Sequence, residues 1–182
     1  MLRKIQEAAH RLFAERGFDA VTTEDIAAAA GISISTYFRH APTKEGLLVE
    51  PVRRAVAEVV ASYGARSATE SAAEALIQLF VENSRDRTGQ REYWQEAILT
   101  APHLLSESAL IDENDDRQFI ALVAARMGVD AATDVRPALL VHTGLATAEF
   151  VLRRWLGADP ESGPPLDVRM EEALRLTLAG FD

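Results

Sequence analysis

Apolar side chains recur at the 3.6-residue spacing of amphipathic helices along most of the chain, and strand-like alternation between turn dipeptides is missing. Residues 2–16 give the first example, and Gly17 follows them as a typical helix terminator. The apolar face of this segment consists of Ile5, Ala8, Ala9, Leu12 and Phe13. The pattern predicts an all-α fold.

Capping residues and helix breakers set the expected boundaries of about nine helices. Thr22 is a predicted N-cap with Asp25 as its capping-box partner, and Ser33 and Thr43 are predicted N-caps of the next two helices. The glycine- and proline-rich stretch 157–165 predicts a loop. Helices are expected at residues 2–16, 22–30, 33–40, 43 to about 63, 69–86, 90–100, 104–127, 133–156 and 167–180.

The composition argues against several kinds of site. The chain has no cysteine, and its four histidines, at positions 10, 40, 103 and 142, lack the spacing of metal ligands. We therefore expect no disulfide, no metal and no cofactor. Apolar runs are interrupted well before the roughly 20 residues that a membrane span needs. No membrane partner is expected, and the cytoplasm is the default location.

The net charge of −9 is distributed unevenly. Residues 1–54 carry eight Lys and Arg against seven Asp and Glu, a net charge of +1, whereas the remaining residues carry eleven against twenty-one, a net charge of −10. This asymmetry fits a small neutral-to-basic head on an acidic body, and a nucleic-acid partner is compatible only with the head.

Two short helices at 22–30 and 33–40 are joined by a tight turn that contains Gly31. This arrangement is typical of a helix-turn-helix, in which the second helix enters the DNA major groove. The spacing alone leaves an alternative open, because an ordinary helical hairpin in an all-α core has the same pattern.

Residues 5–48 resemble the DNA-binding domain of the TetR family of one-component bacterial repressors. The resemblance lies in "LFAERGF" of the first helix, "DIA" and "AGIS" of the second helix and turn, and "TYFRHAPTKE" of the recognition helix. It implies a double-stranded DNA operator as partner, with base contacts from Ile34, Ser35 and Arg39 and phosphate contacts from others. The implied DNA-binding residues are Thr22, Thr23, Ser33, Ile34, Ser35, Thr36, Phe38, Arg39, His40 and Lys44.

This chain departs from the family pattern at two positions of the recognition helix. Phe38 stands where the family often has a phosphate-binding tyrosine, and Ile34 can contact a thymine methyl group but cannot hydrogen-bond a base. Tyr37 is expected to face the core of the head. We expect the sequence specificity of this protein to differ from that of its relatives at Ile34 and Phe38.

The resemblance implies a DNA-binding domain at 1–46 and an effector-binding and dimerisation domain at 47–182. Small and apolar residues on the last two helices fit a homodimer interface, although amphipathic helices also pack within a monomer. The predicted interface residues are Leu139, Leu140, Thr143, Gly144, Thr147, Leu174 and Leu178.

The segments "VLRRWLGAD" and "ARMGVDAATDVRPALL" resemble the C-terminal domain of regulators described as acyl-CoA-like ligand-binding. The resemblance implies a small hydrophobic effector that releases the protein from a palindromic operator. For each pocket candidate, ordinary core packing is the alternative. The candidates are Phe80, Asn83, Tyr93, Trp94, Ile98, His103, Phe119, Val123, Met127, His142 and Phe150.

An enzyme is not expected, because the chain lacks a glycine-rich phosphate loop, G-x-S-x-G and H-E-x-x-H. The acidic pairs Asp112/Glu113 and Asp115/Asp116 lie in a polar stretch that we interpret as a solvated loop. We therefore predict a DNA-binding repressor without catalytic residues. The alternative is an all-α protein-interaction module that does not bind DNA.

Overall fold

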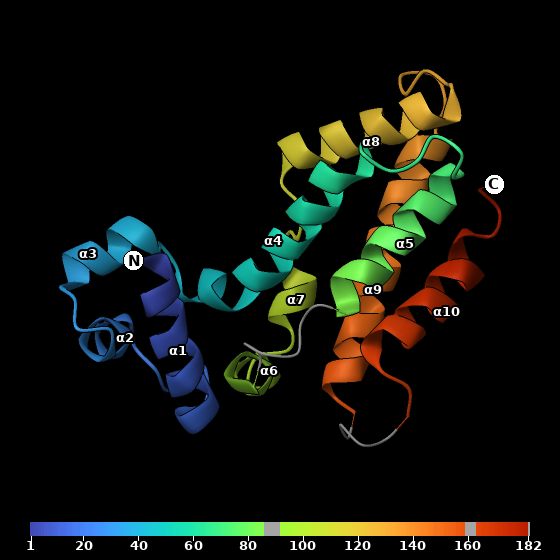
Figure 1. Cartoon of the computed structure of the whole chain (residues 1–182). Helices are drawn as coiled ribbons and strands as arrows, with labels where there is room; N and C mark the ends of the chain where they lie inside the picture. Colours follow the sequence, from blue (N-terminus) through green and yellow to red (C-terminus); the bar gives the residue numbers. More distant parts are fainter. Residues whose placement is uncertain (86–91, 159–162, 182) are drawn as a thin grey trace. The chain divides into compact units, whose positions relative to one another are not determined.

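The computed structural model of the chain describes residues 1–85, 92–158 and 163–181, and these form ten α-helices and no strand. The prediction of an all-α fold is confirmed. The chain divides into two compact units, each assembled from separate stretches of sequence (Figure 1). Unit 1 comprises Met1–Arg53 and Thr88–Ala109, and unit 2 comprises Arg54–Arg87 and Leu110–Asp182.

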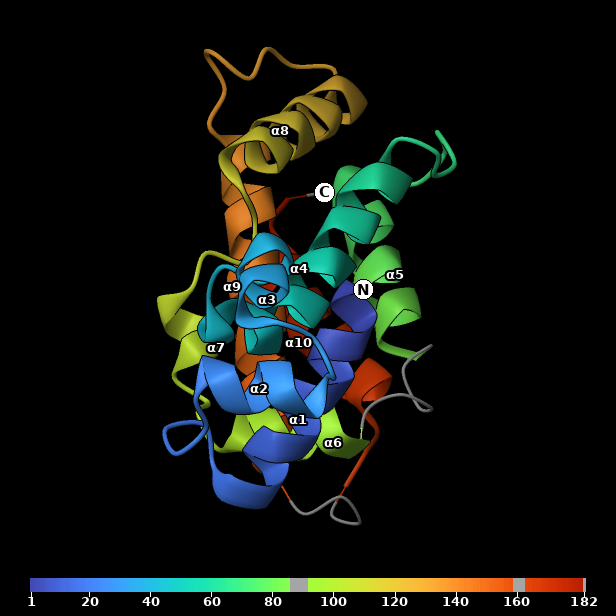
Figure 2. The same ribbon diagram turned by 90° about the vertical axis from the view of Figure 1, so that its left-hand side faces the viewer.

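Unit 1 is built around the N-terminal helices, which Figure 2 shows grouped together. Helix α1 packs on α2 and α2 packs on α3, and α1 also packs extensively on α6. Phe13 on α1 is fully buried, with its ring 5.1 Å from that of Phe18. The helices of unit 1 are α1 (Leu2–Arg16), α2 (Thr23–Ala29), α3 (Ile34–His40), the start of α4 (Lys44–Tyr63), α6 (Glu92–Leu99) and α7 (Leu104–Glu107).

The caps of the short helices are those that the sequence predicts. The Asp25 backbone N–H donates to Thr22 Oγ1 and the Thr22 backbone N–H donates to Asp25, which completes the capping box. Ser33 caps α3 by accepting from the Thr36 backbone N–H. Gly31, between the two helices, has a φ of 62°, a left-handed conformation that favours glycine. Local chemistry therefore fixes the helix-turn-helix geometry.

The packing of α6 on α1 adds a later segment of the chain to the N-terminal helices, and the predicted domain boundary at residue 46 stays a prediction. Trp94, Ala97 and Ile98 of α6 are buried, and the Phe18 backbone N–H donates to Thr100 Oγ1 at 3.1 Å. Unit 1 is therefore completed by α6, which begins at Glu92, whereas the first stretch of the unit ends at Arg53. Sequence periodicity identifies α6 as amphipathic but does not identify the helix on which its apolar face packs.

Unit 2 contains the remainder of α4, α5 (Ala72–Arg85), α8 (Glu113–Met127), α9 (Arg136–Leu156) and α10 (Leu166–Leu178). Helices α5, α9 and α10 pack side by side, and α8 packs on α9 (Figure 1). Gly144 of α9 faces α5 so closely that an added Cβ would lie 2.7 Å from Leu76 Cδ2. The small residue thus permits close approach of α9 to α5.

The prediction of one continuous helix at 104–127 is wrong, because the segment forms two helices, α7 and α8, with a break between them. Ser108 adopts an extended conformation, with φ −99° and ψ 136°, and α7 ends before it. Asp112 then caps α8 by accepting from the Asp115 backbone N–H at 2.8 Å. The acidic residues interpreted as a solvated loop are consequently the cap and first turn of α8, where carboxylates stabilise the N-terminal end of the helix dipole.

None of the helices in the described parts of the chain has the length and apolarity needed to cross a lipid bilayer.

Candidate nucleic-acid interface

Helix α3 has one buried and one exposed side. Tyr37 is completely buried, as predicted, and burial raises the pKa of its hydroxyl to about 12. The exposed side carries Ile34, Ser35, Phe38, Arg39 and His40. In a helix-turn-helix this is the side that is available to a major groove.

Two apolar side chains stand one helical turn apart on the exposed side of α3. Ile34 is 37% exposed and Phe38 is 50% exposed. The Phe38 ring makes an edge contact with the buried Tyr37 ring at 5.3 Å between centroids, which supports it from inside the unit. Exposed apolar groups in a base-reading position suit the methyl group of thymine.

The charged groups near this surface are mainly basic. Arg39 and His40 occupy the last turn of α3, whose first turn has no acidic residue. On α2, Glu24 is exposed, whereas Asp25 is held in the capping box. The Thr22 backbone N–H and hydroxyl lower the pKa of Asp25, which therefore stays ionised at the N-terminus of α2.

Four of the predicted DNA-binding hydroxyls already have partners within the unit. Ser33 Oγ and Thr36 Oγ1 are hydrogen-bonded to each other at 2.9 Å. The Thr22 hydroxyl donates to Asp25 at 2.9 Å, and the Thr23 hydroxyl donates to Glu24 at 3.0 Å. These hydroxyls stabilise the helix starts, and DNA would have to compete with those bonds.

Lys44 is also engaged within unit 1. Its Nζ donates to the backbone oxygens of Phe18 at 3.0 Å and Val21 at 3.2 Å, and it lies 4.3 Å from the centroid of the Phe18 ring. The side chain therefore fastens the loop between α1 and α2 to the start of α4. Its predicted phosphate contact stays a prediction.

The predicted dimer residues divide into a buried and an exposed group, and their place in an interface stays a prediction. The buried group packs inside unit 2, and amphipathic spacing does not distinguish such a core face from an interface. Leu139 is exposed, and Thr143 and Thr147 are partly exposed. The buried group consists of Leu140, Gly144, Leu174 and Leu178.

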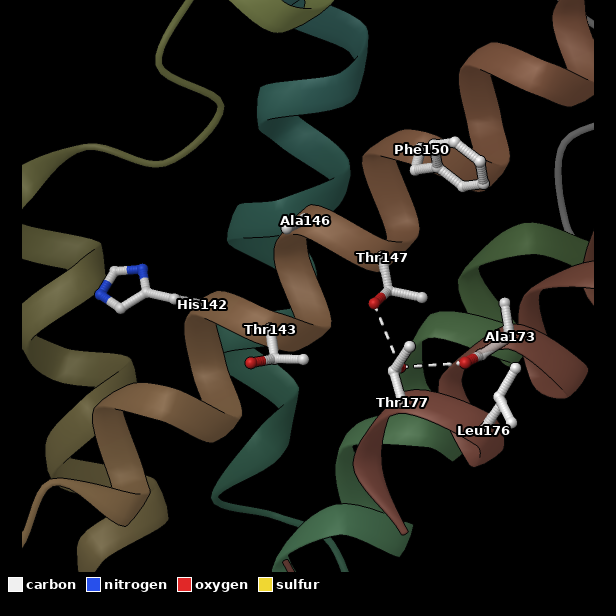
Figure 3. A pocket seen from close by; sticks show the side chains of 8 residues that line it. All are labelled: His142, Thr143, Ala146, Thr147, Phe150, Ala173, Leu176 and Thr177. Carbon is white, nitrogen blue, oxygen red and sulfur yellow. Dashed lines mark hydrogen bonds between the residues drawn. The ribbon is translucent and has the colours of Figure 1, made fainter. Parts of the chain in front are cut away.

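An open depression of about 620 Å³ lies on the outer face of α9 and α10 (Figure 3). Thr147 of α9 donates to Thr177 of α10 at 3.1 Å across it, and the Thr177 hydroxyl bonds to Ala173 O at 2.9 Å. Leu176, 82% exposed, and Phe150, 52% exposed, are its large apolar members. The lining is completed by His142, Thr143, Ala146 and Ala173.

The predicted effector residues are distributed over both units and differ in burial. Trp94 and Ile98 are core residues of unit 1, and Phe80, Phe119 and Val123 are core residues of unit 2. Asn83 and Met127 are half-buried, whereas Tyr93 and His103 are exposed. His142 and Phe150 line the open depression, and His142 Nε2 lies 3.7 Å from Asp116. Their assignment to one effector pocket therefore stays a prediction.

Metal ligation finds no support in the parts of the chain that the structure describes. No group of three or more His, Asp and Glu side chains there is arranged to hold an ion.

Two family models match separate parts of the chain. Residues 5–50 match the family described as bacterial regulatory proteins, tetR family, and residues 66–182 match the MftR C-terminal domain. The first match covers most of α1, all of α2 and α3 and the start of α4, and the second covers all of α5 to α10.

Two relatives match most of the chain. The chain is 32% identical over 173 residues to the HTH-type transcriptional regulator TcmR of Streptomyces glaucescens, and the match covers 90% of this chain and 76% of that protein. It is 28% identical over 155 residues to the putative mycofactocin biosynthesis transcriptional regulator MftR of Mycobacterium tuberculosis, covering 84% and 78%.

Among solved structures, the TetR-family repressor FadR of Thermus thermophilus, in complex with lauroyl-CoA, has a similar fold. The TM-score is 0.60 at 24% identity, over 99% of this chain and 94% of that one. The matching domains and the identity to TcmR agree with the helix-turn-helix described above. The chain is therefore a DNA-binding transcriptional regulator that belongs to the TetR family.

Proposed function

We propose that the chain is a homodimeric repressor that binds a palindromic operator through α3 and is released by a small hydrophobic effector. The observation that carries the DNA side of the proposal is the exposed face of α3. Ser35, Arg39 and His40 have no side-chain hydrogen bond among the described residues, so they are available to DNA.

The exposed face divides into groups that read bases and groups that hold the backbone. Ile34 and Phe38 offer apolar contacts and Ser35 offers a hydroxyl, which suit base edges. Arg39 can donate to a guanine edge or to a phosphate, and His40 at the helix end suits a phosphate. Apolar contacts on two adjacent turns favour an operator with thymines in each half-site.

A homodimer is supported by the outer face of α9 and α10. Phe150, Leu176 and Leu139 are large apolar side chains on these two helices, and at least half of each is exposed in the single chain. The core of a protein–protein interface is rich in such groups. A twofold dimer would also place two copies of α3 on one duplex, as a palindrome requires.

The effector class rests on similarity. The C-terminal part matches the MftR C-terminal domain, and the FadR structure with the same fold contains lauroyl-CoA. We extend this to a long-chain acyl thioester as the first effector to test. Such a ligand shifts the population away from DNA only by its differential affinity for the two states.

Selection of duplexes from a random pool by the purified protein tests the operator, and enrichment of a palindrome is expected. Failure to enrich a palindrome would contradict the assignment of a dimeric operator. The selected duplex is then titrated with lauroyl-CoA, and free coenzyme A serves as the matched control without an acyl chain. Release by lauroyl-CoA alone is expected; equal release or none would contradict the acyl effector but not the operator.

A further inference from the structure

Among the helices that the structure describes, only α4 belongs to both units, and it contains a proline. Pro51 is within α4, and the division between the units follows shortly after it, between Arg53 and Arg54. A proline in a helix interior cannot donate to the carbonyl four residues earlier, and its ring pushes against that carbonyl. Here that carbonyl belongs to the buried residue Leu47. The backbone of α4 therefore lacks one of its own hydrogen bonds close to the unit boundary.

Side chains from two other helices of unit 1 donate to carbonyls at this break. His10 of α1 has its Nε2 2.9 Å from Leu47 O, and a carbonyl can only accept, so this nitrogen carries the proton. Trp94 of α6 donates its indole N–H to the neighbouring Leu48 O at 2.8 Å. Because α1 and α6 pack on each other, both donors have a common support.

A third hydrogen bond joins the two places where the chain leaves unit 1. Arg53 Nε donates to Ala109 O at 2.7 Å. Arg53 and Ala109 are the last residues of the two sequence stretches that form this unit. Two side chains thus donate to α4 oxygens before the proline, and after it the Arg53 side chain of α4 donates to Ala109 O.

We propose that Pro51 makes α4 a hinged helix and that His10 and Trp94, which we call the α4 latch, are positioning residues that hold the turn before the hinge against α1 and α6. An uninterrupted helix would satisfy the Leu47 carbonyl itself and would not need His10. Loss of His10 leaves the Leu47 carbonyl without a partner and favours bent conformations in which it reaches water, whereas loss of Trp94 removes the bond that ties the same turn to α6. The latch lies outside the exposed α3 residues and acts on DNA binding only through α4.

A double-mutant cycle tests whether His10 compensates for the proline. Pro51→Ala restores an N–H for Leu47 O, while His10→Leu removes the donor and His10→Gln replaces it with an amide N–H. At one fixed protein concentration, His10→Leu should raise the unfolding equilibrium constant about tenfold with Pro51 present. With Pro51→Ala the same change should have a clearly smaller effect, and His10→Gln should stay close to the parent. Equal effects in both backgrounds would overturn the latch.

Distance distributions test the hinge itself, which a purely structural role would leave unchanged. The chain has no cysteine, so Arg11→Cys on α1 and Ala61→Cys on α4 accept one spin label each, at exposed positions. Dilution with excess unlabelled protein removes distances between protomers. Pulsed dipolar spectroscopy should give a broader distribution of the distance between the two labels for His10→Leu and for Trp94→Phe than for the parent. The distribution should become narrow again when His10→Leu is combined with Pro51→Ala.

Exposed His103 supplies the matched control, since His103→Leu should leave the distribution unchanged. An unchanged distribution in the His10 and Trp94 variants would overturn the hinge. No DNA takes part in either experiment, so a negative result here would leave the proposed operator binding unaffected.

Discussion

The Arg126 guanidinium of α8 lies over the ring of Tyr63, with Cζ 5.1 Å from the ring centroid, and donates to the backbone oxygen of the same residue at 3.3 Å. Tyr63 is the last residue of α4. The same guanidinium donates to the backbone oxygens of Arg66, Ser67 and Glu70, so it holds the end of α4 and the loop that follows.

Arg126→Ala is expected to lower the free energy of unfolding by about 2–3 kcal/mol, because several carbonyls lose a charged donor. Arg126→Lys should recover only part of this loss, since an ammonium cannot form the planar fork. Urea denaturation measures both. Arg117→Ala on the same helix is the control, because exposed Arg117 bonds only within its own helix, to Glu113 O. A loss equal to that of the control would refute the role of Arg126.

Lys44→Met should weaken binding to a random-sequence duplex, because Lys44 fastens the loop between α1 and α2. The slope of log affinity against log salt concentration tests separately whether Lys44 also binds a phosphate. Arg39→Gln should lower the slope by about 0.9, the effect of one phosphate contact. A comparable fall in slope for Lys44→Met would show that Lys44 does bind phosphate.

His10 gives the protein an acid-sensitive stability. Burial lowers the pKa of His10 below 6.5, opposed in part by its bond to Leu47 O. The unfolded chain therefore binds the proton more readily, so stability is full above pH 6.5 and is lost as the pH falls through the lowered pKa. Urea midpoints at pH 7.5 and below pH 6.5 should differ less in His10→Gln than in the parent. His103→Gln, at an exposed position, should behave like the parent.

Thymine methyl groups should contribute to operator affinity through Ile34 and Phe38. Replacement of a half-site thymine by uracil removes the methyl group and keeps the hydrogen-bonding edge. A contacted methyl should cost about fourfold in affinity. The same uracil should have little effect on Ile34→Ala or Phe38→Ala protein, and uracil in the flanks provides the control. Full affinity for every uracil-substituted half-site would exclude methyl recognition.

Leu176→Glu should convert the proposed dimer into monomer, because it places a charge in the apolar face of α9 and α10. Burial of an unpaired charge should raise the dimer dissociation constant by about a hundredfold or more. Sedimentation equilibrium measures the change. Leu99→Glu makes the same chemical change at an exposed leucine of unit 1 and should leave the dimer intact. A monomeric parent protein would refute the dimer directly.

The parts of the fold that the sequence predicts are those fixed by neighbouring residues. Thr22 with Asp25, Ser33 and Gly31 act within a few positions of the chain, so the caps and turn of the helix-turn-helix follow from the sequence alone. The inward direction of Tyr37 follows from its spacing on α3. The break at Ser108 is different, because helical periodicity continues across it and hides the extended residue.

Contacts between residues far apart in the sequence could not be predicted from local patterns. The spacing of Leu140 and Leu174 resembles that of an interface, but α5 and neighbouring helices cover them. Lys44 donates to two backbone oxygens of the loop between α1 and α2, and the sequence does not reveal these partners. Pro51 did offer a signal, because a proline inside a predicted helix leaves a carbonyl without its N–H and calls for an outside donor. The pattern does not identify that donor as His10.

The assembly of unit 1 from two stretches of sequence constrains how the protein can be synthesised and re-engineered. On the ribosome, α6 cannot pack on α1 until α6 has been synthesised. The head therefore cannot complete its fold until residues beyond 99 have emerged. A chimera that exchanges only residues 1–46 would pair a foreign α1 with the α6 of this chain. To exchange operator specificity and keep function, α6 must therefore be exchanged together with the recognition helix. Alternatively, the substitutions must be restricted to the exposed side of α3.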